Sequence, residues 1–182
     1  MTAFAPNTIG IPYFKKDREC NMEIIKQLYD INRLFENVDD FGPAYESFLK
    51  VSNVELGYRG LEGRMSEFFE DVRQTAICIA TRGQAGSGDI QFFMSGIKRV
   101  KSFMYQEKYQ IEEAITDASR AEYLATCFEK GILEIEKYPK ENPKVVLDMS
   151  ISEILPTKLR KLRNVIPEAY YYWAKVDELL KS

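Results

Sequence analysis

Two long stretches of the sequence carry apolar or small residues at alternating steps of three and four, and a glycine-rich segment, 83–88, joins them. The first stretch has these residues at Val51, Val54, Tyr58, Leu61, Met65, Phe68, Val72, Thr75 and Ile79. The second keeps the same rhythm from Ile90 to Ile135. Such steps place side chains along one side of an α-helix, as in coiled coils. We therefore predict an all-α fold with a long antiparallel helical hairpin, whose arms span 44–82 and 89–137.

Two features argue against unbroken arms. Three glycines lie between residues 57 and 63, and each costs about 1 kcal/mol relative to alanine inside a helix. A break there is the alternative, but the apolar pattern continues unshifted, which favours one helix. With a turn near residue 85, this stretch would lie opposite 111–114. In the second arm Glu107 occupies an apolar position, so 105–109 is the expected place for an interruption.

Shorter helices flank the hairpin. Residues 16–38 have an apolar row at Ile24, Leu28, Ile31, Phe35 and Val38, which predicts a first helix. The C-terminal subregion, 144–182, predicts short helical turns over 156–166 and a last helix that begins at Pro167. We expect these helices to pack on the hairpin as one bundle domain, 15–182.

The N-terminal segment, 1–14, has no charged side chain and two prolines. Its apolar residues would expose a large area to water. We expect an extended arm that docks in a groove of its own bundle or of a neighbouring subunit. A disordered tail is the third option, against which the apolar content argues.

The chain has no histidine. This excludes Ser-His-Asp and Cys-His catalysis and histidine-ligated zinc or haem within one chain. Cys20, Cys78 and Cys127 are far apart among apolar residues, which is typical of buried structural thiols in a reducing compartment. We expect no metal, no cofactor and no enzyme activity. A lysine- or carboxylate-based enzyme is the remaining catalytic alternative.

No apolar run reaches the length of about 18 residues that crosses a bilayer. The N-terminus also lacks the early positive charge of a signal peptide. We expect a cytoplasmic protein, or one inside a phage or virus particle, without membrane contact. The net charge of -3 gives no general attraction to nucleic acid.

Two sets of residues resemble chemical sites but have simpler explanations. The glycine-rich segment 83–88 is not followed by the lysine of a phosphate-binding loop. We therefore predict a turn there, with Asp89 as the cap of the next helix. The acids Glu112, Glu113, Asp117 and Glu122 lack the histidines of carboxylate metal sites in helical bundles. We predict that these four acids form a solvated helix face.

Aromatic residues are the first candidates for partner binding. Consecutive helical residues point about 100° apart, so at least one of the aromatics 170–173 should be exposed, and exposed tyrosine and tryptophan often anchor interfaces. The predicted partner-binding residues are Phe4, Ile9, Ile11, Tyr13, Tyr170, Tyr171, Tyr172 and Trp173. The leading hypothesis is a non-catalytic, all-helical interaction or assembly subunit of a larger intracellular, phage or viral complex, with protein partners or self-association.

The alternative hypothesis is a helical subunit that binds RNA or single-stranded DNA. Its basic residues form two clusters, Lys98, Arg99 and Lys101, and Lys158, Arg160, Lys161 and Arg163. Basic side chains hold phosphate, and nearby aromatics can stack on unpaired bases. The outer face of any helix is normally charged, so the discriminating observation is whether both clusters lie on one face.

Overall fold

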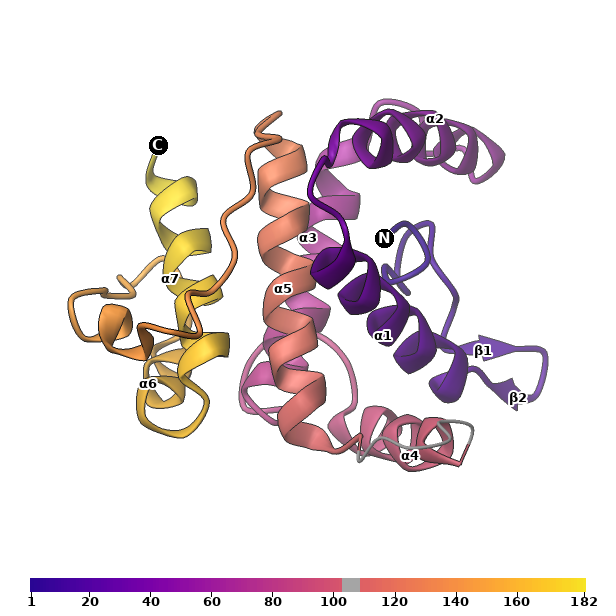
Figure 1. Cartoon of the computed structure of the whole chain (residues 1–182). Coiled ribbons are helices and arrows are strands. Elements are labelled where there is room, and N and C mark those ends of the chain that lie inside the picture. Colours follow the sequence, from indigo (N-terminus) through magenta and orange to yellow (C-terminus); the bar gives the residue numbers. More distant parts are fainter. Residues whose placement is uncertain (103–108) are drawn as a thin grey trace.

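A computed structural model describes residues 1–102 and 109–182, and these residues confirm an all-α fold (Figure 1). Strands in this part of the chain are limited to the short antiparallel pair β1 (Phe14–Lys15) and β2 (Arg18–Glu19). The helices are α1 (Asn21–Asn37), α2 (Gly42–Tyr58), α3 (Met65–Ala80), α4 (Ile90–Lys101), α5 (Ile111–Glu129), α6 (Leu162–Val165) and α7 (Pro167–Lys181). Two 3-10 turns, η1 (Pro143–Leu147) and η2 (Thr157–Lys161), lie between α5 and α6.

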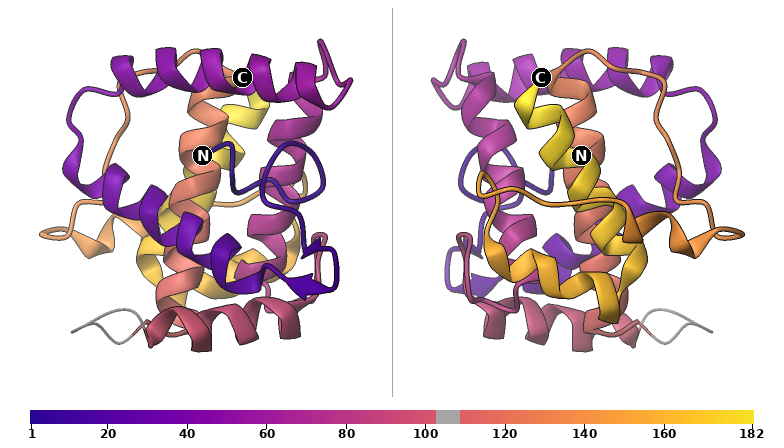
Figure 2. Two further views of the ribbon diagram at one scale, coloured as in Figure 1. Left: turned by 90° about the vertical axis from the view of Figure 1, so that its right-hand side faces the viewer. Right: turned by 90° about the vertical axis from the view of Figure 1, so that its left-hand side faces the viewer.

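Helix α5 is the centre of the fold, with α1, α3 and α7 packed around it (Figure 1). Every residue from Asp117 to Phe128 is buried. Alanines at 114, 118, 121 and 125 leave room for close neighbours on several sides. Over this stretch the helix has no solvent face. Helices α2 and α4 run across opposite ends of the packed group (Figure 2).

The expected hairpin is present in a shorter form. Helices α3 and α5 pack antiparallel, because Arg82 pairs with Glu112 at 2.7 Å near one end and Arg73 pairs with Glu122 at 2.8 Å further along. The prediction that 44–82 is one helix is wrong. The chain breaks after Tyr58, and Gly60 and Gly63 there have φ angles of 64° and 76°, which glycine adopts without the penalty of a side chain.

The predicted register at these glycines is also wrong. A Cβ atom added at Gly60 or Gly63 would meet nothing within 4 Å, so no helix in the described part of the chain packs against them. The second arm is likewise divided, since α4 ends at Lys101 and α5 begins at Ile111. Its expected interruption at 105–109, including Glu107, lies almost wholly outside the described residues.

The second arm also ends earlier than the predicted residue 137. Gly131 has a φ of 68°, and the amide of Ile132 donates to the carbonyl of Cys127 at 2.8 Å. A left-handed glycine with such a bond terminates a helix. The residues that follow have no helical structure up to η1 and run along α7 instead.

The N-terminal segment folds back on its own chain. It forms a series of turns instead of one extended arm, and Phe4 and Ile9 are buried. The carboxylate of Asp71 accepts hydrogen bonds from the amides of Asn7 and Thr8, both at 2.9 Å. A buried carboxylate on α3 therefore fixes the segment in place. The predicted helix over 16–38 begins only at Asn21, after the β1–β2 pair.

The C-terminal helices confirm the expected turns and the start of the last helix at Pro167. The expectation that one of the aromatics 170–173 is exposed is wrong, since all are at most 4% exposed. Helix α7 contacts α5 on one side, and residues 132–166 cover the other. Tyr172 accepts a hydrogen bond from the amide of Tyr138 at 2.9 Å, and Tyr170 receives one from Arg163 at 2.6 Å. These residues belong to the core.

Candidate docking surface on helix α2

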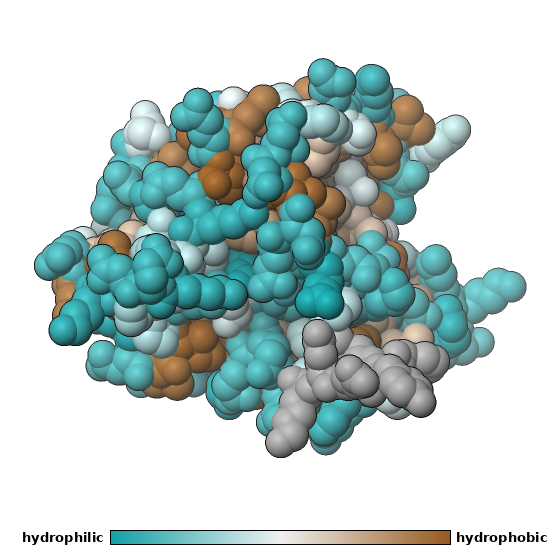
Figure 3. Space-filling view, viewed as in Figure 1, coloured by the Kyte–Doolittle hydropathy of each residue, from teal (hydrophilic) through white to brown (hydrophobic). Residues whose placement is uncertain are grey.

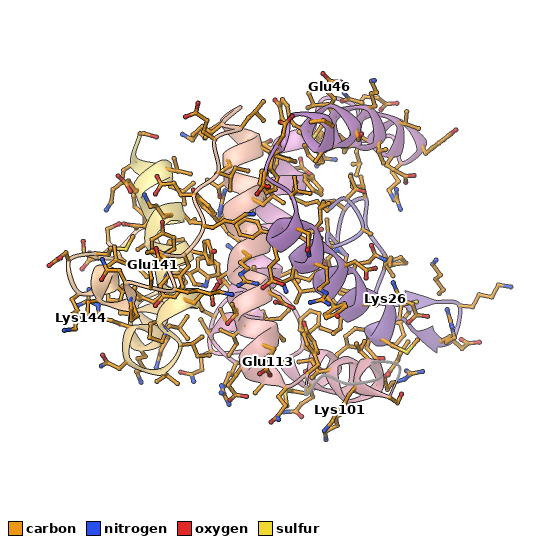
Figure 4. All side chains as sticks on the ribbon, viewed as in Figure 1. Lys26, Glu46, Lys101, Glu113, Glu141 and Lys144 are labelled. Carbon is orange, nitrogen blue, oxygen red and sulfur yellow. The ribbon has the colours of Figure 1, made fainter. Side chains whose placement is uncertain are left out.

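Helix α2 is attached to the bundle by one narrow row of side chains. Its buried residues are Phe48, Ser52 and Leu56, four residues apart and therefore on one face. The ring of Phe48 packs against Phe68 and Phe128, with centroids 5.4 and 5.5 Å away. The rest of the helix projects from the bundle, and Glu46 points away from it (Figure 4).

One exposed row along α2 is mainly apolar. Val51, Val54 and Tyr58 are 48%, 54% and 82% exposed, and with Ser47 they follow the steps of four, three and four that mark one helical row. These residues begin the apolar seam of the sequence, which predicted a facing helix. Among residues 1–102 and 109–182, no helix covers them. Figure 3 shows hydrophobic residues exposed on the upper part of the molecule, where α2 lies.

An apolar groove continues from this face towards α1 and α5. It has a volume of about 490 Å³, and its lining includes Ile31, Leu34, Val38, Ala44, Ser47, Val51, Leu124 and Phe128. Leu34 is 44% exposed at the groove's α1 edge. Ser47 and Val51 belong to both the outer row and the groove. Together these features form what we term the α2 surface: Leu34, Ala44, Ser47, Val51, Val54 and Tyr58.

The residues predicted to bind partners lie elsewhere. Phe4 and Ile9 are buried, and Ile11 and Tyr13 are half-buried against the chain's own core. Tyr13 packs edge-on against Phe92, with centroids 5.3 Å apart. The sequence did indicate the α2 surface, because Val51, Val54 and Tyr58 belong to the apolar row that predicted a helix–helix contact. The expectation of a continuous hairpin assigned them an internal partner.

A second feature is a polar cleft between α1, α5 and residues 138–140 and 165–168, with a volume of about 570 Å³. Asp117 lies at its wall and accepts a hydrogen bond from the Tyr109 hydroxyl at 2.8 Å. Burial raises the pKa of Asp117 to about 8, although Tyr109 and Arg120 act in the opposite direction. Asp117 is only 3% exposed, so its carboxyl is almost wholly buried in the wall of the cleft.

Arg120 joins three helices beside this cleft. Its guanidinium donates to Asn32, to Glu36 at 3.0 Å and to Glu168, which come from α1 and from the start of α7. It also lies over the rings of Phe35 and Tyr172, about 6 Å from each centroid. Arg120 is not among the predicted site residues, because a single arginine in an alanine-rich helix gives no sign of burial.

The prediction of a solvated acidic face is wrong for two of its four residues. Glu112 and Glu113 are exposed, but Asp117 and Glu122 are buried. Glu122 accepts hydrogen bonds from Arg73 at 2.8 Å and from Thr126 at 3.0 Å. The error arises because α5 is enclosed on all sides. Among the described residues no group of three cysteines or acids is placed to hold a metal ion.

The cysteines and the cap agree with the predictions. Cys20, Cys78 and Cys127 are free and buried, and burial raises the pKa of the Cys127 thiol to about 11. The side chain of Asp89 accepts a hydrogen bond from the amide of Gln91 at 2.8 Å, as expected for a helix cap.

The two basic clusters lie on elements that pack against different helices. Helix α4, with Lys98, Arg99 and Lys101, packs on α1, whereas η2 and α6 pack on α7. Arg160 donates to the carbonyl of Ile151 at 3.0 Å, and Arg163 donates to that of Met149. These two arginines therefore hold the C-terminal turns. Lys158 and Lys161 are exposed and line a small groove with Arg82.

Comparisons with known proteins do not identify a function for these residues. No family model, no curated protein and no solved structure matches the chain. In the part of the chain that the structure describes, no helix has the length and apolar content needed to cross a membrane.

Proposed function

We propose that the protein is a non-catalytic, all-helical interaction or assembly subunit of a larger intracellular, phage or viral complex, and that it docks protein partners through the α2 surface. The observation that carries this proposal is the exposed row of Val51, Val54 and Tyr58. The row has the spacing of a helix–helix seam, and it borders an apolar groove.

Single exposed apolar residues are normal on any protein. The α2 surface differs because its apolar residues are contiguous, and contiguous apolar patches typically mark interaction sites. Tyr58 is also the type of residue that contributes most to protein interfaces. A helix whose apolar face lies in a groove of another protein is a common form of recognition, and α2 offers both a row and a groove.

Substitution of Val54 tests the proposal. Tagged wild-type protein and the Val54→Lys variant are cross-linked in the cells of origin, and the captured proteins, including the chain itself, are compared by mass spectrometry. Ile154→Lys is the matched control, since Ile154 is 57% exposed and Val54 is 54% exposed, but Ile154 lies on a C-terminal turn. We expect a protein that wild type and the control capture and Val54→Lys loses. Identical captured sets for all three would refute the proposal.

Binding of nucleic acid stays a prediction, but fewer of its basic residues are available to hold phosphate. Arg160 and Arg163 already bind backbone carbonyls, and Arg82 pairs with Glu112. Exposed lysines remain at 98, 101, 158 and 161, and exposed lysines are common on a helix surface. We therefore place protein docking first.

A further inference from the structure

We infer that the partner at the α2 surface is a second copy of this chain, with the two α2 helices paired antiparallel about a two-fold axis between Ser52 and Asn53. This inference rests on the proposed function and names the partner of the same site. It follows from the order of large and small residues along the row, from the groove beside it and from the apolar area that pairing would cover.

The order of residues along the row fits only one direction of pairing. From the start of α2 the row reads Ser47, Val51, Val54 and Tyr58. An antiparallel pair centred between 52 and 53 places Tyr58 of each copy opposite Ser47 of the other, and Val51 opposite Val54. Each contact then joins a large residue with a small one, or two of equal size, as close packing requires.

A parallel pair packs less well. It would place Tyr58 against Tyr58 and Ser47 against Ser47, so that one end is overfilled and the other leaves a void. Both faults destabilise an interface, since voids lose contacts and overfilling forces side chains from preferred rotamers.

The groove supplies the receiving site for tyrosine. Ser47 lines it together with Ala44 and Leu34, so Tyr58 of the second copy meets the groove in the antiparallel register. Tyr58 is 82% exposed in the single chain. On one flank of the pair, Lys50 lies across from Asn53 and Gly57 of the second copy, and the two copies of Lys50 are offset by about 7.5 Å along the helices, so no like charges are directly opposite.

The area is sufficient for a weak dimer. Two Tyr58 side chains would remove about 300 Å² from water on the scale of buried aromatics. The half-exposed Val51, Val54 and Leu34 of both copies would add roughly 300 Å². An interface of average composition, about 60% apolar, that contained this apolar area would total about 1,000 Å². This is the lower limit for a specific interface, so the dimer should dissociate on dilution.

Sedimentation of the purified full chain tests the inference. From about 1 µM to about 1 mM, the mass of wild type and of Ile154→Lys should rise from one chain towards two. Val54→Lys should weaken dimerisation at least about tenfold, with an unchanged thermal unfolding curve at concentrations where both proteins are monomeric. A wild-type chain that remains monomeric throughout would overturn the inference.

Cysteine cross-linking tests the direction. The native cysteines are at most 1% exposed, so cysteines introduced on the surface react separately. Under mild oxidation, a mixture of Ser47→Cys and Tyr58→Cys chains should form a mixed disulfide. Ser47→Cys alone should not, because its two copies would be about 16 Å apart along the helices, beyond the reach of a disulfide. Cross-linking of Ser47→Cys alone, without the mixed product, would overturn the antiparallel geometry.

The outcomes also separate this inference from the proposed function. A monomeric chain that captures a different protein through Val54 in cells would overturn the inference and support the proposed function. A monomeric chain without any Val54-dependent partner would overturn both.

Discussion

Asp117→Asn should remove a large part of the pH dependence of stability. Burial raises the pKa of Asp117 from 3.8 to about 8 in the folded protein. The folded state therefore holds a proton that the unfolded state releases above pH about 4. Stability from this group is fully present below that pH and is lost as the pH rises through about 8.

The magnitude follows from the size of the shift. One pKa unit corresponds to about 1.4 kcal/mol, so the free energy of unfolding of the wild type should fall relative to that of Asp117→Asn by about 1.4 kcal/mol per pH unit. Between pH about 5 and about 7 the difference amounts to about 3 kcal/mol. Asparagine retains a carbonyl that can accept the Tyr109 hydrogen bond.

The assay is urea unfolding of both proteins at several pH values in this range. Glu122, whose pKa burial also raises to about 8, is present in both proteins and largely cancels from the difference. The charged groups around Asp117, which are Arg120, Glu36 and Glu113, are also unchanged. Parallel stability curves would refute the assignment of Asp117 as a buried carboxyl that stays protonated at neutral pH.

Three further substitutions test the packing. Arg120→Met should destabilise the fold by about 3 kcal/mol, because it removes the ion pairs to the partly buried Glu36 and Glu168; an unchanged melting temperature would contradict this role. Asp71→Asn should cost about 2 kcal/mol in charge-assisted hydrogen bonds, and limited proteolysis should then cut within residues 1–10, where the wild type resists. Gly96→Ala should cost about 2 kcal/mol by overpacking, because its Cβ would lie 2.4 Å from the carbonyl oxygen of Asn21; thermal unfolding that matches wild type would show that α1 and α4 are not in close contact.

Local sequence signals predicted the elements they control directly. The apolar row of α1, Asp89 at the start of α4 and Pro167 at the start of α7 each specify helix structure within a few residues. The glycines at 60 and 63 show the limit of such reasoning. An unshifted apolar pattern is compatible with both a continuous helix and a break, and only packing decides between them.

Local sequence patterns could not predict which charged residues are buried. Asp117, Arg120 and Glu122 look like the polar face of an amphipathic helix, and their burial depends on α1, α3 and α7 enclosing α5. The burial of the aromatics of α7 likewise depends on tertiary packing, because residues distant in sequence cover the outer side of this helix. The α2 surface shows the converse, since its apolar row was visible in the sequence but the absence of an internal partner was not.

Labelling of Tyr58 in its working environment tests the central claim most directly. Hydroxyl-radical footprinting followed by mass spectrometry compares the dilute purified chain with the protein in its cells of origin. Tyr58 is 82% exposed in the single chain and should react strongly there. We expect labelling to fall severalfold in cells, while the half-buried Tyr45 on the inner side of α2 serves as an internal reference. Equal labelling of Tyr58 in both samples would show that nothing covers the α2 surface and would contradict the account.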